Sequence, residues 1–247
     1  MRHAMYDEPV TIYRDAYADA YPSLYLTPWA RKHALNVANL ERIVAALPAA
    51  RPRWLDLACG QGWHFSAFAG RAEMTGLDQS AAQLARARAN APGARFVQDD
   101  MTRAAFPTGS FDLVTNFWAG YCYLRDRGHI LALLRTALDW IAPGGALYVE
   151  VLVGRDLAEF NRSLYAQRTG FGVTPCSDDF SEWLYDDSGG RHRMTSPPLE
   201  DFLAVVEPAF AAVEAHHDGG FMHHLIATGR RRDPYSGRRV EERTSTV

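Results

Sequence analysis

Two glycines and a carboxylate are the residues whose types and spacing point most clearly to chemistry. Gly60 and Gly62 follow a short apolar stretch at residues 54–58, and Asp78 ends the next such stretch. Glycines at the carboxyl end of a strand let the main chain approach a ligand, and a carboxylate one strand over can accept both ribose hydroxyls of a nucleoside. The pattern predicts a nucleoside-binding crevice, with a tight turn and a helix cap as the structural alternatives.

Alternating strand and helix patterns must position these residues. Strands are expected at 54–58, 74–77, 95–97, 111–116 and 146–153, and helices at 31–47, 63–69, 81–90 (capped by Ser80) and 127–141. Such alternation with short connections indicates an α/β protein with a parallel, doubly wound sheet. Strands at 210–217 and 221–228, after a helix at 199–206, would add an antiparallel hairpin and complete a mostly parallel, seven-stranded sheet.

Five short elements together resemble the class I S-adenosylmethionine-dependent methyltransferases, in their small-molecule branch. They are the glycine-rich D-x-A-C-G-x-G of residues 56–62, Asp78-Gln79, Asp100-Met101, the F-D-x-V of residues 111–114 and the Pro-Gly-Gly turn of residues 143–145. They occur in the family's order and cover about residues 53–153. A dehydrogenase would instead have a third glycine where Phe65 stands, and would leave Asp100-Met101 and the Pro-Gly-Gly turn unexplained.

The resemblance implies S-adenosylmethionine as the cofactor and gives the glycine loop a role. The main chain of this loop would face the methionine part of the cofactor, through Ala58, Cys59, Gly60, Gln61 and Gly62. Asp78 would hold the ribose, and Gln79 would lie against the adenine.

Four residues after the third and fourth strands receive roles in the same way. Asp100 would accept a hydrogen bond from the adenine amino group, while the N–H of Met101 reaches a ring nitrogen. Asn116 and Phe117 would flank the sulfonium and its methyl group. The alternatives are a turn capped by Asp100, and plain packing for Met101 and Phe117.

The N-terminal residues 1–30 carry many aromatic rings and few aliphatic side chains. Aromatic faces attract cations such as sulfonium by about 0.5–2 kcal/mol, and a lid over a site excludes water. We therefore predict an N-terminal lid in which Tyr21, Tyr25 and Trp29 contact the cofactor, with Arg31 near its carboxylate. Ordinary packing of these rings is an equal alternative.

Residues 154–197 interrupt the alternation and are predicted to form an inserted cap on the acceptor side, with a hairpin at 180–185 and 191–195. The many aromatic rings of this segment suit a hydrophobic acceptor pocket or a homodimer interface equally well. Trp183 in the cap, and Tyr121 with Tyr123 after strand four, are the predicted acceptor contacts.

Histidines are the candidates for a general base, which methyl transfer needs only where the acceptor carries a proton. His192, in the predicted cap hairpin, is the first choice for the catalytic base. His33 is a further candidate. His64 begins the helix after the glycine loop, where the helix N-terminus disfavours the cation, and is assigned a supporting role.

Two adjacent histidine pairs, at 216–217 and 223–224, resemble a metal site at first sight. Alternate residues of a strand point to opposite faces, so each face receives only two of the four rings. No cysteine or carboxylate with ligand spacing accompanies them, and their hairpin is expected at the far edge of the sheet, away from the cofactor end. No metal site is predicted.

Composition narrows the class of partner. The 247-residue chain has a formal net charge of -3, and its dense basic runs, 230–232 and 238–239, lie near the C-terminus. Nucleic acid is therefore not expected as a partner. Three widely spaced cysteines, no signal-peptide pattern and no apolar run that could span a bilayer favour a cytoplasmic protein without a membrane partner. Residues 31–230 are the expected catalytic domain, and residues 231–247 an expected disordered tail.

The resemblance and the residues together imply transfer of a methyl group from S-adenosylmethionine to an O or N atom of a small-molecule metabolite. The mechanism would be an in-line displacement in which proximity and alignment supply roughly 7–11 kcal/mol. The alternative is a protein of the same fold that binds the cofactor without methyl transfer.

Overall fold

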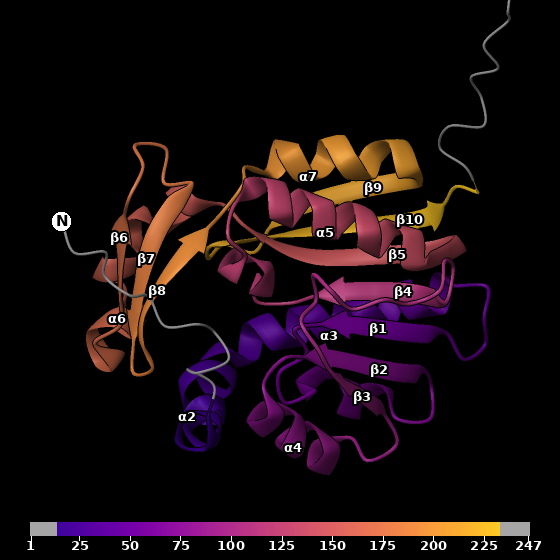
Figure 1. Cartoon of the computed structure of the whole chain (residues 1–247), viewed down its shortest axis with the longest axis horizontal. Coiled ribbons are helices and arrows are strands. Elements are labelled where there is room, and N and C mark those ends of the chain that lie inside the picture. Colours follow the sequence, from indigo (N-terminus) through magenta and orange to yellow (C-terminus); the bar gives the residue numbers. More distant parts are fainter. Residues whose placement is uncertain (1–13, 233–247) are drawn as a thin grey trace, which may run out of the picture.

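The computed structural model describes residues 14–232, and its main feature is a seven-stranded sheet (Figure 1). The strand order is β3 (Arg95–Gln98), β2 (Glu73–Asp78), β1 (Arg53–Leu57), β4 (Phe111–Asn116), β5 (Ile141–Leu152), β10 (Met222–Arg230) and β9 (Phe210–His217). Strands β1 to β5 pair in parallel, and β10 pairs antiparallel with both β5 and β9. The predicted doubly wound sheet with an antiparallel hairpin is confirmed.

Helices cover both faces of this sheet. Helices α5 (Arg127–Trp140) and α7 (Leu199–Val206) pack on one face, where their side chains share a core cluster with Leu55. Helix α3 (Ala30–Ala46) and a 3-10 helix at Trp63–Phe68 share a second cluster with Trp54. Successive strand residues thus serve opposite layers, as in parallel sheets that are buried on both sides. No helix within residues 14–232 is long and apolar enough to cross a membrane.

The local signals in the sequence act at the expected places, with one exception. Helix α4 (Ala81–Asn90) begins after Ser80, whose hydroxyl accepts the N–H of Gln83 at 3.2 Å. Residues 143–145 were expected to form a turn before the fifth strand, but they lie inside β5. The pairing of β5 with β4 shifts register between Phe111 and Leu113. Gly144 and Gly145 therefore lie in an irregular stretch of the strand, where glycine tolerates the backbone bend.

The N-terminal segment is helical from Asp15 to Trp29, after an extended Arg14. It consists of α2 (Asp15–Tyr21), one π-helical turn (Pro22–Leu26) and one 3-10 turn (Thr27–Trp29). Figure 1 shows α2 beside α4. The side chain of Arg86 in α4 pairs with that of Asp19 and joins the two helices. We call residues 14–29 the lid.

The inserted segment, residues 154–197, forms a small body of its own, which we call the cap. A 3-10 helix (Gly154–Arg162) and α6 (Leu164–Thr169) precede an antiparallel sheet of β6 (Gly172–Pro175), β7 (Glu182–Asp187) and β8 (Gly190–Thr195). The predicted hairpin is confirmed as β7 and β8, and β6 adds a third strand that was not predicted. In Figure 1 the cap stands at one end of the main sheet, with α2 below it.

Candidate functional site

The loop after β1 has the geometry of a ligand cradle. Ala58, Gly60 and Gly62 have φ values of 54°, 52° and 64°, so three of its five residues are left-handed. Glycine adopts this region freely, whereas a left-handed alanine costs of order 1 kcal/mol and persists only where the surroundings hold it. A Cβ built on Gly60 would meet nothing within 4 Å, so the space beside this turn is open.

Asp78 lies against this loop. Its carboxylate accepts the N–H of Gly60 at 2.8 Å through Oδ2 and the N–H of Ser80 at 2.8 Å through Oδ1. Burial raises the pKa of the Asp78 carboxyl, and these two hydrogen bonds act in the opposite direction. The glycine loop and the carboxylate therefore form one rim, as the spacing in the sequence predicts.

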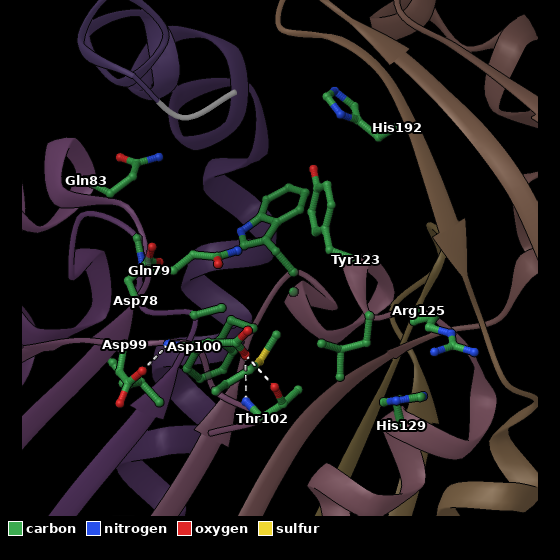
Figure 2. Close-up of a pocket in the computed structure, with 18 of the residues that line it drawn as sticks. Asp78, Gln79, Gln83, Asp99, Asp100, Thr102, Tyr123, Arg125, His129 and His192 are labelled. Atoms are coloured by element: carbon green, nitrogen blue, oxygen red, sulfur yellow. Dashed lines mark hydrogen bonds between the residues drawn. The ribbon is translucent and has the colours of Figure 1, made fainter. Parts of the chain in front are cut away.

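A cavity of about 610 Å³ opens at this rim, within the size range of small-molecule sites. Its cofactor end includes nine residues, seven of them predicted: Ala58, Gly60, Asp78, Gln79, Asp99, Asp100, Met101, Thr102 and Phe117. In Figure 2, Asp78, Gln79 and Asp99 of this group lie at the left. Tyr21 of the lid also lines it. The opposite end consists of Tyr123, Leu124, Arg125, His129, His192, Arg193 and Thr195.

Asp100 caps a turn, which was the structural alternative to its predicted role at the adenine, and it also lines the cavity. Its Oδ1 accepts the N–H of Thr102 at 2.8 Å and the Thr102 hydroxyl at 2.7 Å, so it caps the turn (dashed in Figure 2). The residue nevertheless lines the cavity. Asp99 and Thr102, which sequence reasoning missed, flank the Asp100-Met101 element and belong to the same turn.

Gln83 is a further residue that sequence reasoning missed. It lines the cavity from the first turn of α4, it is buried, and its Oε1 has no hydrogen-bond partner in the described part of the chain. A buried acceptor without a donor costs about 1–3 kcal/mol, so a ligand donor at this point is expected. The signal in the sequence that could have identified Gln83 was its position in the first turn of the helix that Ser80 caps.

Other predicted cofactor contacts lie behind the cavity wall. The Gln61 amide donates to the carbonyl of Ala18 in the lid at 2.6 Å, and that of Asn116 donates to the carbonyl of Leu57 at 2.8 Å. Cys59 is buried, and none of Cys59, Gln61, Gly62 and Asn116 lines the cavity. These residues support the loop rather than face the open space.

Three aromatic residues that were predicted to contact the cofactor or the acceptor do not line the cavity. Trp29 packs edge-on against Trp118 and Tyr165, outside the cavity lining. Tyr121 is buried, and its hydroxyl accepts the N–H of Leu152 at 3.0 Å. Trp183 is buried, and its indole N–H donates to Ser196 at 2.9 Å. Tyr121 and Trp183 are therefore core residues: each ring is buried, and its polar atom already has a hydrogen-bond partner within the protein.

Two more predicted residues lie away from the cavity. Tyr25 does not line the cavity, and its hydroxyl donates to Asp187 of the cap at 2.7 Å. Arg31, expected near the cofactor carboxylate, is exposed and does not line the cavity. Tyr123, in contrast, lines it, and in Figure 2 its hydroxyl points towards His192.

His192 is the predicted base, and the cap places it at the acceptor end of the cavity. Its side chain is 1% exposed, and its Nε2 lies 2.9 Å from Oδ1 of Asp187. Its Nδ1 is buried and has no hydrogen-bond partner among residues 14–232. A carboxylate can only accept, so Nε2 carries the proton and Nδ1 keeps its lone pair. This is the arrangement that a general base requires.

A second buried polar group lies behind Trp118, where Lys32 and Glu150 form an ion pair. Glu150 also accepts the main-chain N–H of Trp118 at 2.6 Å, and the Lys32 ammonium lies 4.1 Å from the Trp118 ring centre. Trp118 and Ala119 are left-handed, with φ values of 56° and 47°. Backbone strain of this kind clusters at functional sites, and here it places Trp118 in the cavity wall.

His33 and His64 lie beside this ion pair and are unsuited to accept a proton. Burial, followed by the Lys32 charge, lowers the pKa of His33 to about 4. Burial, followed by the charges of His33 and Lys32, lowers the pKa of His64 well below its usual value. The prediction that His64 is a neutral supporting residue is consistent with this placement. Its ring packs against that of Phe117, with the centres 4.3 Å apart.

The C-terminal histidines pair by face as predicted, since His217 lies opposite His223 and His216 opposite His224. The expectation that no carboxylate joins them is wrong: Asp156 accepts from Nε2 of His223 at 3.0 Å. Ligand atoms of Asp156, His217 and His223 lie within 4.8 Å of one another.

The tautomer of His217 argues against a metal at this cluster. Its Nδ1 accepts the N–H of Gly219 at 3.1 Å, so its Nε2 carries the proton and cannot coordinate as it stands. The hairpin is at the sheet edge, as expected. However, His223 pairs with Val151 near the carboxyl end of β5, so the pairs lie towards the same end of the sheet as the cavity.

A family model described as a methyltransferase domain matches residues 55–145. The chain is 33% identical over 153 residues to the biotin biosynthesis bifunctional protein BioCD of Bordetella avium, a match that covers 60% of this chain and 31% of that protein. It is 30% identical over 118 residues to a phthiotriol/phenolphthiotriol dimycocerosates methyltransferase of Mycobacterium tuberculosis, covering 45% and 42%. The chain thus matches less than half the length of these curated relatives.

Among solved structures, the fold is similar to that of CalS10, an amino pentose methyltransferase from Micromonospora echinaspora. The TM-score is 0.58 at 22% identity, and the match covers 92% of this chain and all of that chain. The likeness shows a shared fold. The predicted class I methyltransferase fold is confirmed.

Proposed function

Because the chain carries a methyltransferase domain on the class I fold, we propose that it transfers a methyl group from S-adenosylmethionine to an O or N atom of a small molecule. The observation that carries this proposal is the contact between Asp78 and the Gly60 N–H. It brings the two most informative sequence elements to one rim of a cavity of suitable size.

The residues present fit this cofactor. The open space beside Gly60 admits a ligand against the main chain, and Asp78 offers acceptor oxygens for ribose hydroxyls. The turn at Asp100-Met101 and the unpartnered amide oxygen of Gln83 offer further polar atoms to a nucleoside. When bound, the cofactor supplies an electrophilic methyl group on a positively charged sulfur.

The acceptor would enter from the opposite end of the cavity. Tyr123 and Thr195 offer hydroxyls for orientation, and His192, whose Nε2 donates to Asp187, offers the lone pair of its Nδ1. The protein would align the acceptor, exclude water under the lid and cap, and take up a proton where the acceptor carries one.

The test measures binding and turnover separately. Isothermal titration calorimetry with S-adenosylhomocysteine should give micromolar binding, and Asp78→Ala should weaken it about 100-fold or more, since hydrogen bonds to a charged group contribute about 1.5–3 kcal/mol each. Glu73→Ala, an exposed acid at the start of the same strand, is the matched control.

Turnover is followed as release of S-adenosylhomocysteine from S-adenosylmethionine with a panel of hydroxyl and amine acceptors. Absence of cofactor binding would rule out the proposal. Binding without release of product on any acceptor would favour the alternative, a cofactor-binding protein without methyl transfer.

A further inference from the structure

Asp187, at the end of β7, is the most densely hydrogen-bonded carboxylate of the acceptor end. It accepts from His192 at 2.9 Å, from the Gly189 N–H at 2.7 Å, from the Tyr17 hydroxyl at 2.5 Å and from the Tyr25 hydroxyl at 2.7 Å. Its side chain has no exposed surface. Four donors around one buried carboxylate fix its position and orientation, because each lost bond would leave a buried polar group unpaired.

Asp187 remains charged in this environment. Burial acts to raise the pKa of its carboxyl, but the hydrogen bonds from His192, Tyr17 and Tyr25 more than offset this and hold the pKa below its usual range. A charged carboxylate holds the proton of His192 on Nε2 and also stabilises the imidazolium that forms when Nδ1 takes a second proton.

The two tyrosines come from the lid. Tyr17 belongs to α2 and Tyr25 to the π-helical turn, at sequence separations of 170 and 162 residues from Asp187. Their hydroxyls are 2.7 Å apart, and that of Tyr25 lies 3.1 Å from the Tyr185 hydroxyl of the cap. The carboxylate that orients the base is therefore itself held by the lid.

The same lid helix also contacts the cofactor end. The carbonyl of Ala18, next to Tyr17, accepts the side-chain amide of Gln61 in the glycine loop at 2.6 Å. Tyr21, one turn further along α2, lines the cavity. One helix thus touches the cradle on one side and the carboxylate of the base on the other.

We propose that Asp187 is the positioning residue for His192, and that Tyr17 and Tyr25 make the alignment of this base depend on docking of the lid. The proposal rests on the proposed function and narrows its acceptor to one with an ionisable X–H group, above all a hydroxyl. A neutral amine attacks without losing a proton first, whereas a hydroxyl gains from a base in the transition state.

The step balances within the site. The hydroxyl oxygen of the acceptor forms a bond to the methyl carbon as the S–CH₃ bond breaks, and the sulfur keeps that electron pair. The O–H proton passes to Nδ1 of His192, and the resulting imidazolium is paired with Asp187. The proton later leaves to water when the lid opens, which restores the neutral ring.

The first measurement needs neither cofactor nor acceptor. Isotope-edited NMR of the histidine rings, with His192→Gln for assignment, should show His192 as a single tautomer protonated on Nε2. Asp187→Ala should give mixed tautomers, because the acceptor of the Nε2 proton is lost. A single Nε2–H tautomer in Asp187→Ala would overturn the positioning role of Asp187, whatever the protein's activity.

The second measurement separates the lid contacts from general packing. Tyr17→Phe removes a hydroxyl that reaches Asp187, whereas Tyr165→Phe removes one that joins cap to lid through the carbonyl of Leu24 at 2.8 Å. Tyr17→Phe should broaden the His192 tautomer signal and lower kcat about tenfold on a hydroxyl acceptor, with KM little changed. Tyr165→Phe should do neither.

The third measurement concerns the rate. Asp187→Ala should lower kcat on a hydroxyl acceptor on the order of 100-fold, the lower range of a general base's contribution, and leave the affinity for S-adenosylhomocysteine within about twofold. Equal effects of Tyr17→Phe and Tyr165→Phe would overturn the coupling to the lid. An unchanged rate in Asp187→Ala would overturn the role of His192 as the base. If the wild-type protein did not bind S-adenosylhomocysteine at all, that result would instead count against the proposed function.

Discussion

The two ends of the cavity are built in different ways. At the cofactor end, residues 58–62 and 99–102 directly follow β1 and β3, and residues 78–79 lie at the end of β2. The contact of Asp78 with Gly60 joins two of these neighbouring segments. At the acceptor end, His192 comes from a second sheet, and its partner Asp187 is held by two lid tyrosines from the other end of the described chain. The cofactor end is thus part of the common fold, whereas the acceptor end is assembled from insertions on that fold.

The largest expected effect concerns the buried ion pair of Lys32 and Glu150. Glu150→Gln should lower the free energy of unfolding by about 3–5 kcal/mol, because it leaves the buried Lys32 without its partner. Urea denaturation measures this loss. The double variant Lys32→Met/Glu150→Gln should recover most of it, since a neutral pair needs no compensation. A loss below 1 kcal/mol in the single variant would contradict a structural role for the pair.

The next effect is on the pH dependence of stability, and it follows from the contrast between two buried histidines. His33 lies beside Lys32, and its pKa is lowered to about 4, whereas His192 has a carboxylate partner. Between pH 6.5 and 4 the unfolded chain binds a proton at His33 that the folded chain does not. Stability should therefore fall as the pH drops through this window, by about 3 kcal/mol from this residue. His33→Gln should flatten that part of the stability curve measured by urea denaturation.

A pair of glycine variants separates the two ends directly. A Cβ on Gly76 would lie 2.6 Å from Sγ of Cys59 under the glycine loop, and one on Gly154 would lie 1.8 Å from the carbonyl oxygen of Phe180 in the cap. Each alanine substitution should cost about 2 kcal/mol through overpacking. Gly76→Ala should also weaken binding of S-adenosylhomocysteine, whereas Gly154→Ala should lower turnover and leave that binding intact.

Calorimetry and turnover assays on both variants decide whether the two ends are independent. Gly93→Ala is the control, since its Cβ would meet nothing within 4 Å. If both variants weakened cofactor binding equally, the distinction between the ends would be lost.

The smallest effect sharpens the assignment of one aromatic ring. Trp183→Phe removes the hydrogen bond to Ser196 and should cost about 1 kcal/mol of stability. Because Trp183 does not line the cavity, KM for the acceptor should stay within about twofold. A large rise in KM without loss of stability would restore this residue as an acceptor contact.

Much of the main sheet could be predicted because its signals are local. The bounds of α4, α7, β4 and β9 agree with those expected from apolar periodicity, the Ser80 cap and the prolines before α7. Residues 143–145 show the limit of such signals. The Pro-Gly-Gly sequence indicates a turn, but pairing with β4 keeps it inside a strand.

The acceptor end could be predicted only in outline. The hairpin that carries His192 has recognisable strands and a glycine turn, but β6 has only four residues and pairs across the intervening loop. Aromatic content alone does not distinguish a pocket from a core, so Tyr121 and Trp183 were assigned to the acceptor although both are buried among other residues. Gln83 and Trp118 lacked any motif.

By itself, the sequence determined the parallel sheet and the rim that joins Gly60 to Asp78, because strand order and short loops bring those positions together wherever the pattern occurs. Only the tertiary structure decided that Asp187 bonds to His192, Tyr17 and Tyr25. Those contacts depend on how the lid and the cap pack on the sheet, and residues so far apart in the chain carry no local signal of their meeting.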